Sequence, residues 1–227
     1  MSERFSNRTY VTFLSALLFA ALLALGACND NGDNPQNKEE KENTVPVAKP
    51  KVTDVFKGER EALSYALTIF VDQPGPGGSA ATWFPKGFMD VDGGHAYVKL
   101  ECLNTDSTST SLTVGFYPKV RPRDPNNPIA DGELRDDTGR HFEVSKKYPL
   151  TKPNFDKALA YIDSVELNKV KYHLNDYNCA DFVIRVGRAA GENVPDTYGT
   201  WDINFGMGKR LTGGGSNPGN LGQDLRQ

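Results

Sequence analysis

Residues 172–183 read YHLNDYNCADFV and mark the start of a helix. A polar, aromatic run ends at Asn178, and the apolar residues that follow recur at the spacing of one helix face, at Cys179, Phe182, Val183, Val186 and Ala190. Either Asp176 or Asn178 can cap this helix, and Gly191 ends it. The thiol of Cys179 therefore lies in the first turn, where unpaired N–H groups and the helix dipole favour the reactive thiolate.

A thiolate becomes a catalyst when a base lies beside it. The chain has three histidines, and His95 starts an alternating strand pattern that runs to Glu101. We interpret Cys179 and His95 as the centre of the functional site. The same alternation places Cys102 on the opposite face of the strand from His95. In an oxidising compartment, a disulfide between Cys102 and Cys179 is the structural alternative.

The N-terminal segment has the features of an export signal. Arg4 and Arg8 precede an apolar run at 11–25 that is short for a membrane span, and the run ends in Leu-Gly-Ala-Cys at 25–28. This pattern resembles a bacterial lipoprotein signal. The resemblance implies that residues 1–27 are removed and that Cys28 is diacylated, which would anchor the protein to a membrane of the bacterial cell envelope. A plain signal peptide is the alternative.

The remainder divides into a tether and one domain. Residues 28–51 contain almost no large apolar side chain, so we predict a disordered tether there and a folded domain over 52–227. The formal net charge of the whole chain is −3, and no basic cluster indicates a nucleic-acid partner.

The order of the expected elements indicates the fold class. Strand patterns occupy Ala66–Val71, His95–Glu101, Ser111–Tyr117 and His141–Ser145, and helical patterns follow from Pro153 and from Cys179. Strands followed by helices are typical of an α+β fold, with an antiparallel sheet packed against helices. We expect a proline-rich loop at 121–135 and a glycine-rich coil after Gly199.

The spacing of the two central motifs resembles a known group of enzymes. Gly94–Val98 (GHAYV), followed much later by Asn178–Phe182 (NCADF), resembles the circularly permuted papain-like hydrolases, which include NlpC-type cell-wall peptidases and lecithin:retinol acyltransferase-like enzymes. The resemblance covers about Thr68 to Ala190. It implies that Cys179 is the nucleophile, that His95 is the general base, and that the Cys179 N–H is a candidate oxyanion donor.

The third catalytic residue is where this chain departs from that group. Those enzymes usually place a His, Asn, Asp or Gln on the strand after the histidine, and Ser111–Tyr117 carries none of these. A hairpin that turns near Asp106 would put Tyr117 opposite His95. We favour His141 on the next strand as the third member, with Tyr117 as the alternative, and we consider Gln73 as a side-chain oxyanion donor.

These observations predict a lipid-anchored extracytoplasmic thiol hydrolase. The expected substrate is an amide bond, in a peptidoglycan stem peptide by analogy with the resembled enzymes. We expect no cofactor and no metal, because the histidines and cysteines lack spacings such as H-x₃-H or C-x₂-C. The alternatives are a non-catalytic binding or structural lipoprotein of the envelope on the same scaffold, and a lipid acyltransferase or esterase. The oligomeric state is not indicated.

Overall fold

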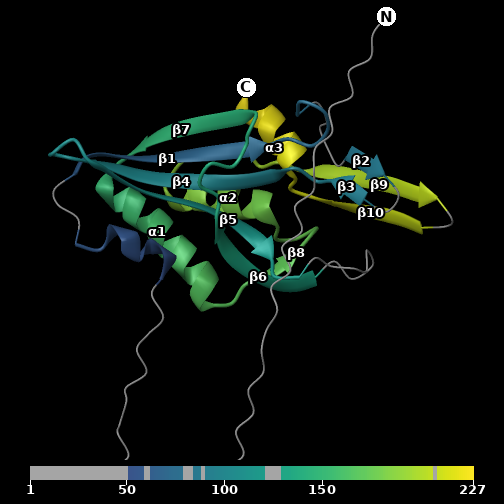
Figure 1. Ribbon diagram of the computed structural model, residues 1–227, viewed down its shortest axis with the longest axis horizontal. Helices are drawn as coiled ribbons and strands as arrows, with labels where there is room; N and C mark the ends of the chain where they lie inside the picture. Colours follow the sequence, from purple (N-terminus) through teal and green to yellow (C-terminus); the bar gives the residue numbers. More distant parts are fainter. Residues whose placement is uncertain (1–50, 59–61, 79–83, 88–89, 121–128, 207–208) are drawn as a thin grey trace, which may run out of the picture. The chain divides into compact units, whose positions relative to one another are not determined.

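The computed structural model describes residues 51–58, 62–78, 84–87, 90–120, 129–206 and 209–227 (Figure 1). Its main element is an antiparallel sheet of six strands in the order β7-β1-β4-β5-β6-β8. The strands are β1 (Ala62–Asp72), β4 (His95–Asn104), β5 (Ser109–Pro118), β6 (Ile129–Asp136), β7 (Val144–Leu150) and β8 (Lys171–His173). Two separate strand pairs are β2 (Phe84–Gly87) with β3 (Asp90–Asp92), and β9 (Gly199–Gly206) with β10 (Lys209–Gly215).

The helices complete an α+β domain, which confirms the expected fold class. A 3₁₀ helix, η1 (Val52–Phe56), precedes β1, and the α-helices of the described residues are α1 (Lys152–Leu167), α2 (Cys179–Ala189) and α3 (Pro218–Leu225). Apolar strand residues pack against α1 and α2 in one continuous core. Its fully buried members include Leu67, Ile69, Val98, Leu100 and Phe116 from the sheet, and Phe155, Ile162 and Phe182 from the helices.

The local sequence accounts for helix α1. Thr151 caps it, because its side chain accepts a hydrogen bond from the backbone N–H of Asn154 at 3.4 Å, and a proline stands in the first turn. The buried face repeats at helical spacing, at Phe155, Ala158, Ile162 and Val165. The proline and the apolar spacing are the two features from which the sequence predicts this helix.

Three expectations for the chain were wrong in detail. The strand expected at His141–Ser145 is β7 and begins only at Val144, so His141 precedes it. The loop expected at 121–135 contains strand β6, which pairs with β5. The glycine-rich tail contains the pair β9–β10 and helix α3. The backbone of the tail packs too closely against its neighbours for a side chain at Gly215. A Cβ there would lie 2.1 Å from the backbone oxygen of Asn175.

The expected signal at 1–27, the lipidated Cys28 and the tether up to residue 50 lie outside the described residues. Among the helices that the structure describes, none is long and apolar enough to cross a membrane.

Candidate active site

Asn178 fixes the start of helix α2 and thereby the position of Cys179. Its Oδ1 accepts hydrogen bonds from the backbone N–H groups of Ala180 at 2.8 Å and Asp181 at 3.4 Å, and the Asp181 carboxylate accepts the Asn178 N–H at 3.0 Å. This is a capping box. The cap accepts the N–H groups of the second and third helical positions. Within the described residues, the N–H of the first position, Cys179, is left without an acceptor. It is therefore available to a ligand.

The side-chain amide of Asn178 also ties the helix start to two other segments. Its Nδ2 donates to the backbone oxygen of Leu174 at 2.9 Å and to that of Ser216 at 2.7 Å. The second bond joins α2 to Ser216, which lies between strand β10 and the N-cap of helix α3, Asn217. Because Asn178 is buried, these bonds are shielded from water, and Cys179 is held by more than its own helix.

The first residue of strand β4, His95, lies beside the first residue of helix α2, Cys179. Burial alone would lower the pKa of His95, but hydrogen bonding to Asp137 and to the Cys179 side chain, together with the negative charge that each of them can carry, raises it above its ordinary value. A raised pKa means that the imidazolium form of His95 is favoured next to this thiol. Such a pair, thiolate with imidazolium, is the reactive state of a thiol hydrolase.

Asp137, which follows strand β6, is the residue that orients His95. Its Oδ2 lies 3.0 Å from Nε2 of His95, and both side chains are almost fully buried, at 5% and 6% exposure. Because Nε2 is engaged by Asp137, Nδ1 is the ring nitrogen left to face Cys179. Two backbone hydrogen bonds hold Asp137 in place. Its N–H donates to the backbone oxygen of Thr113, and its backbone oxygen accepts the N–H of Arg140 in the turn that follows.

Gly115, on strand β5, leaves the space in which the His95–Asp137 pair forms. A Cβ atom at this position would lie 2.1 Å from Asp137 Oδ2 and 2.7 Å from His95 Nε2. Any side chain at Gly115 would therefore enter the hydrogen bond itself. Within the sheet, Gly115 pairs with Tyr97 across β4 and β5.

The structure places Asp137, and not the favoured His141, against the imidazole of His95. The side chain of His141 is 75% exposed, and its Nε2 lies 2.9 Å from Oε1 of Glu143. His141 lies outside β7, which begins at Val144, and its ring contacts Glu143 two residues along the chain. The alternative, Tyr117, is at the site: its ring stacks on that of His95, with ring centroids 4.4 Å apart and an angle of 30° between the planes.

Gln73, the expected oxyanion donor, is used to hold helix α3. Its Nε2 donates to the backbone oxygen of Gly219 at 2.7 Å, and its side chain fills the space against Gly222. Its Oε1 is buried and bonds to no described residue. The amide thus already has an acceptor within the protein.

The two cysteines of the described residues, Cys102 and Cys179, do not form a disulfide. Cys102 is fully buried, and its sulfur lies 3.7 Å from Oδ1 of Asn104. The structural alternative that the sequence left open is therefore not realised in this structure.

One group of side chains within the described part of the chain has the composition of a metal site. Asp72, His141 and Glu143 bring their ligand atoms within 4.8 Å of one another. Each already has a partner: His141 pairs with Glu143, and Asp72 lies 3.6 Å from Nη2 of Arg140.

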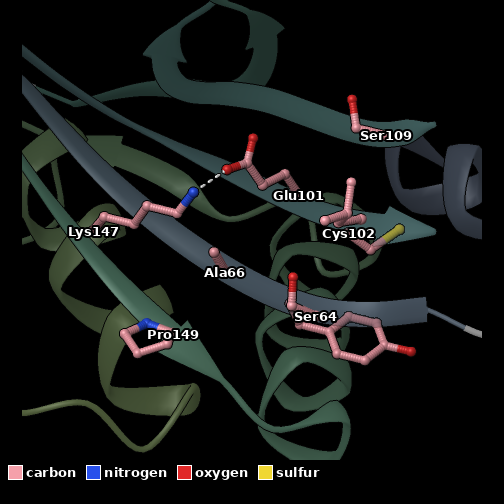
Figure 2. Close-up of a pocket in the computed structure, with 9 residues that line it drawn as sticks. Ser64, Ala66, Glu101, Cys102, Ser109, Lys147 and Pro149 are labelled. Atoms are coloured by element: carbon pink, nitrogen blue, oxygen red, sulfur yellow. Dashed lines mark hydrogen bonds and ion pairs between the residues drawn. The ribbon is translucent and has the colours of Figure 1, made fainter. Parts of the chain in front are cut away.

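A cavity of about 400 Å³ lies on the sheet, away from these residues. Side chains of β1, β4, β5 and β7 line it, and Figure 2 shows the ion pair between Lys147 and Glu101, at 2.5 Å, next to Ala66 and Pro149. None of the lining residues is Cys179, His95 or Asp137. The cavity is thus a feature separate from the candidate active site.

Comparisons with protein family models, with curated proteins and with solved structures found no match to this chain.

The sequence offered little to single out Asp137. It follows Asp136 directly, and Thr138-Gly139 after it reads as an ordinary polar turn. Asp136 uses its carboxylate locally, accepting the backbone N–H of Thr138 at 2.8 Å. Only the pairing of β6 with β5 decides which of the two neighbouring carboxylates faces His95.

Proposed function

We propose that this chain is a lipid-anchored thiol hydrolase of the extracytoplasmic side of a bacterial envelope, with a circularly permuted papain-like fold. The substrate we infer is an amide bond of a peptidoglycan stem peptide. The substrate and the location rest on the expected signal at 1–27, the lipidated Cys28 and the resemblance of the GHAYV and NCADF motifs. The chemistry rests on the site.

The observation that carries the proposal is the arrangement of three groups from three elements. Cys179 stands at the first position of α2, His95 lies beside it with a raised pKa, and Asp137 holds the other side of the imidazole at 3.0 Å. A thiol at a helix start, a base on a strand and a carboxylate that orients the base are the parts of a nucleophilic triad. Their order along the chain, base before nucleophile, supports the permuted form.

In the acylation step, the Cys179 thiolate attacks the amide carbonyl carbon and forms a carbon–sulfur bond. The carbonyl oxygen takes the electron pair, and the Cys179 N–H can donate to the resulting oxyanion. His95, as imidazolium, then gives its proton to the amide nitrogen. The carbon–nitrogen bond breaks, the amine leaves, and a thioester on Cys179 remains.

In the deacylation step, neutral His95 takes a proton from a water molecule, and the hydroxide formed attacks the thioester carbonyl. The second tetrahedral intermediate collapses with loss of the Cys179 thiolate, and the product leaves as a carboxylic acid. His95 ends as imidazolium, which restores the starting ion pair. Asp137 keeps its hydrogen bond to Nε2 throughout and holds Nδ1 directed at the sulfur.

The observation that favours a non-catalytic scaffold is the burial of the site. Cys179 is 6% exposed and His95 is 4% exposed, so the reacting atoms present little surface to a substrate. A binding or structural lipoprotein would need the same fold and no reactive thiolate. A lipid acyltransferase or esterase would use the same thiolate and differ in the acyl group that it accepts.

The test is incubation of the purified full chain with peptidoglycan fragments, with products identified by mass spectrometry. We expect new amine and carboxylic acid ends from the wild-type chain, a covalent acyl adduct on Cys179, and neither in the Cys179→Ala variant. The Cys102→Ala variant is the matched control and should retain activity. Equal product from the wild type and Cys179→Ala would overturn the proposal. In a parallel incubation with an acyl lipid, an adduct that forms there and not with peptidoglycan fragments would replace the substrate by a lipid.

A further inference from the structure

Tyr117 and His95 share one carboxylate. The Tyr117 hydroxyl donates to Oδ1 of Asp137 at 2.5 Å, and Oδ2 of the same carboxylate lies 3.0 Å from His95 Nε2. Tyr117 also stacks its ring on the imidazole. Tyr117 therefore contacts both the base and the group that orients the base, from the strand next to the one that carries His95.

Arg140 extends this arrangement at the turn after β6. Its Nη1 donates to the Tyr117 hydroxyl at 3.3 Å and lies 4.0 Å from Oδ1 of Asp137. The turn itself is tied to the sheet, because the hydroxyl of Tyr97 donates to the backbone oxygen of Arg140 at 2.7 Å. A phenol and a guanidinium thus converge on the oxygen of Asp137 that His95 does not use.

We propose that Tyr117 is a positioning residue of the hydrolase proposed above: its hydroxyl holds the Asp137 carboxylate aligned with His95, so that the imidazolium–thiolate pair persists. The inference rests on that proposed function and adds a residue to it. Tyr117 touches no reacting atom in the scheme, and acts through Asp137.

Charged and aromatic groups from several elements surround His95. Cys179 on α2 and Asp137 after β6 act on the imidazole directly, whereas Tyr97 on β4 stacks beside it with ring centroids 5.9 Å apart. Asp72 on β1, opposite His95 in the sheet register, lies 3.6 Å from the guanidinium of Arg140. Burial, followed by the bond to Asp137, raises the pKa of Tyr117, so it remains a proton donor at neutral pH.

Without the Tyr117 hydroxyl, Oδ1 of Asp137 would be buried, and within the described part of the chain only the guanidinium of Arg140, 4.0 Å away, would compensate its charge. A buried carboxylate oxygen that loses its donor turns toward the remaining cation. That rotation weakens the hydrogen bond of Asp137 to His95 Nε2. The imidazolium, and with it the thiolate of Cys179, would then be less stable.

The experiment is the pH profile of iodoacetamide alkylation of Cys179 in the full chain, measured for the wild type and for Tyr117→Phe. We expect the midpoint of the profile to move to higher pH and the rate near pH 6 to fall about tenfold, with the two profiles converging at high pH. The matched control is Tyr148→Phe, since the hydroxyl of Tyr148 is buried and bonds to no described residue. Its profile should coincide with that of the wild type.

Two further variants keep the test decisive. Arg140→Met removes the donor to the Tyr117 hydroxyl, and the Arg140 side chain is 39% exposed. It should move the midpoint of the alkylation profile in the same direction as Tyr117→Phe, but by less. This variant keeps the test available if Tyr117→Phe fails to fold. Asp137→Asn should move it further. A Tyr117→Phe profile identical to that of the wild type, with Asp137→Asn shifted, would overturn the positioning role alone. A wild-type thiol that is no more reactive than an ordinary cysteine would overturn the proposed function with it.

Discussion

A single methyl group at Gly115 should separate His95 from Asp137. In Gly115→Ala the new Cβ would lie 2.1 Å from Asp137 Oδ2 and 2.7 Å from His95 Nε2, so at least one side chain must move. A hydrogen bond to a charged group is worth about 1.5–3 kcal/mol, and each 1.4 kcal/mol is about a factor of ten in an equilibrium. The imidazolium–thiolate pair should therefore become about 10- to 140-fold less favourable relative to the neutral pair.

The assay combines thermal unfolding with an NMR titration of the His95 ring in the full chain. Gly132→Ala is the matched control, because a Cβ there would also clash, at 2.2 Å from Cζ of Phe116, but away from the imidazole. We expect both variants to lose stability, by about 1–3 kcal/mol from overpacking, and only Gly115→Ala to lower the pKa of His95. An unchanged titration of His95 in Gly115→Ala would refute the argument that Asp137 sustains the imidazolium.

Two other perturbations test separate parts of the site. Asn178→Ala removes the cap of α2 and leaves the backbone oxygens of Leu174 and Ser216 without their donor, so the free energy of unfolding should fall by about 2–4 kcal/mol in denaturant titrations. A loss below about 0.5 kcal/mol would show that the cap matters little. Asp137→Asn should slow peptide hydrolysis at least about 100-fold. The matched control Asp136→Asn, one residue away, should leave the rate nearly unchanged. Equal losses in the two variants would contradict the role of Asp137. His141→Ala should keep wild-type hydrolysis rates, since its ring pairs with Glu143 on the surface, and a large loss would restore His141 to the site.

The parts of this protein that the sequence predicted are those decided by local pattern. The helix that starts at Cys179 and the strand that starts at His95 both carry their own periodicity, and the structure has them at these residues. The hairpin of β4 and β5 followed from a polar turn near Asp106, and Tyr97 pairs with Gly115 in the register that this turn implies. That register places Tyr117 against His95, as the ring stacking shows.

The parts that the sequence did not predict depend on contacts between distant segments. Asp137 reaches His95 only because β6 pairs with β5, and nothing in the residues before Asp137 reads as a clear strand. The tail after Gly199 has the composition of a coil, since glycine lowers strand propensity. It forms β10 because it pairs with β9, and its glycines leave room for close neighbours: at Gly213 a Cβ would lie 2.6 Å from Oδ1 of Asn175. Such close approaches are not visible in a single sequence.

The central claim is that His95 activates Cys179, and alkylation of the unreduced full chain by iodoacetamide tests it most directly. The modified residues are mapped by mass spectrometry near pH 6 and near pH 8, in the wild type and in His95→Ala, with the buried Cys102 as an internal reference. We predict fast modification of Cys179 already near pH 6 in the wild type and its loss in His95→Ala. Slow modification of Cys179 that is the same with and without His95 would contradict the account and leave Cys179 as a buried thiol of the core.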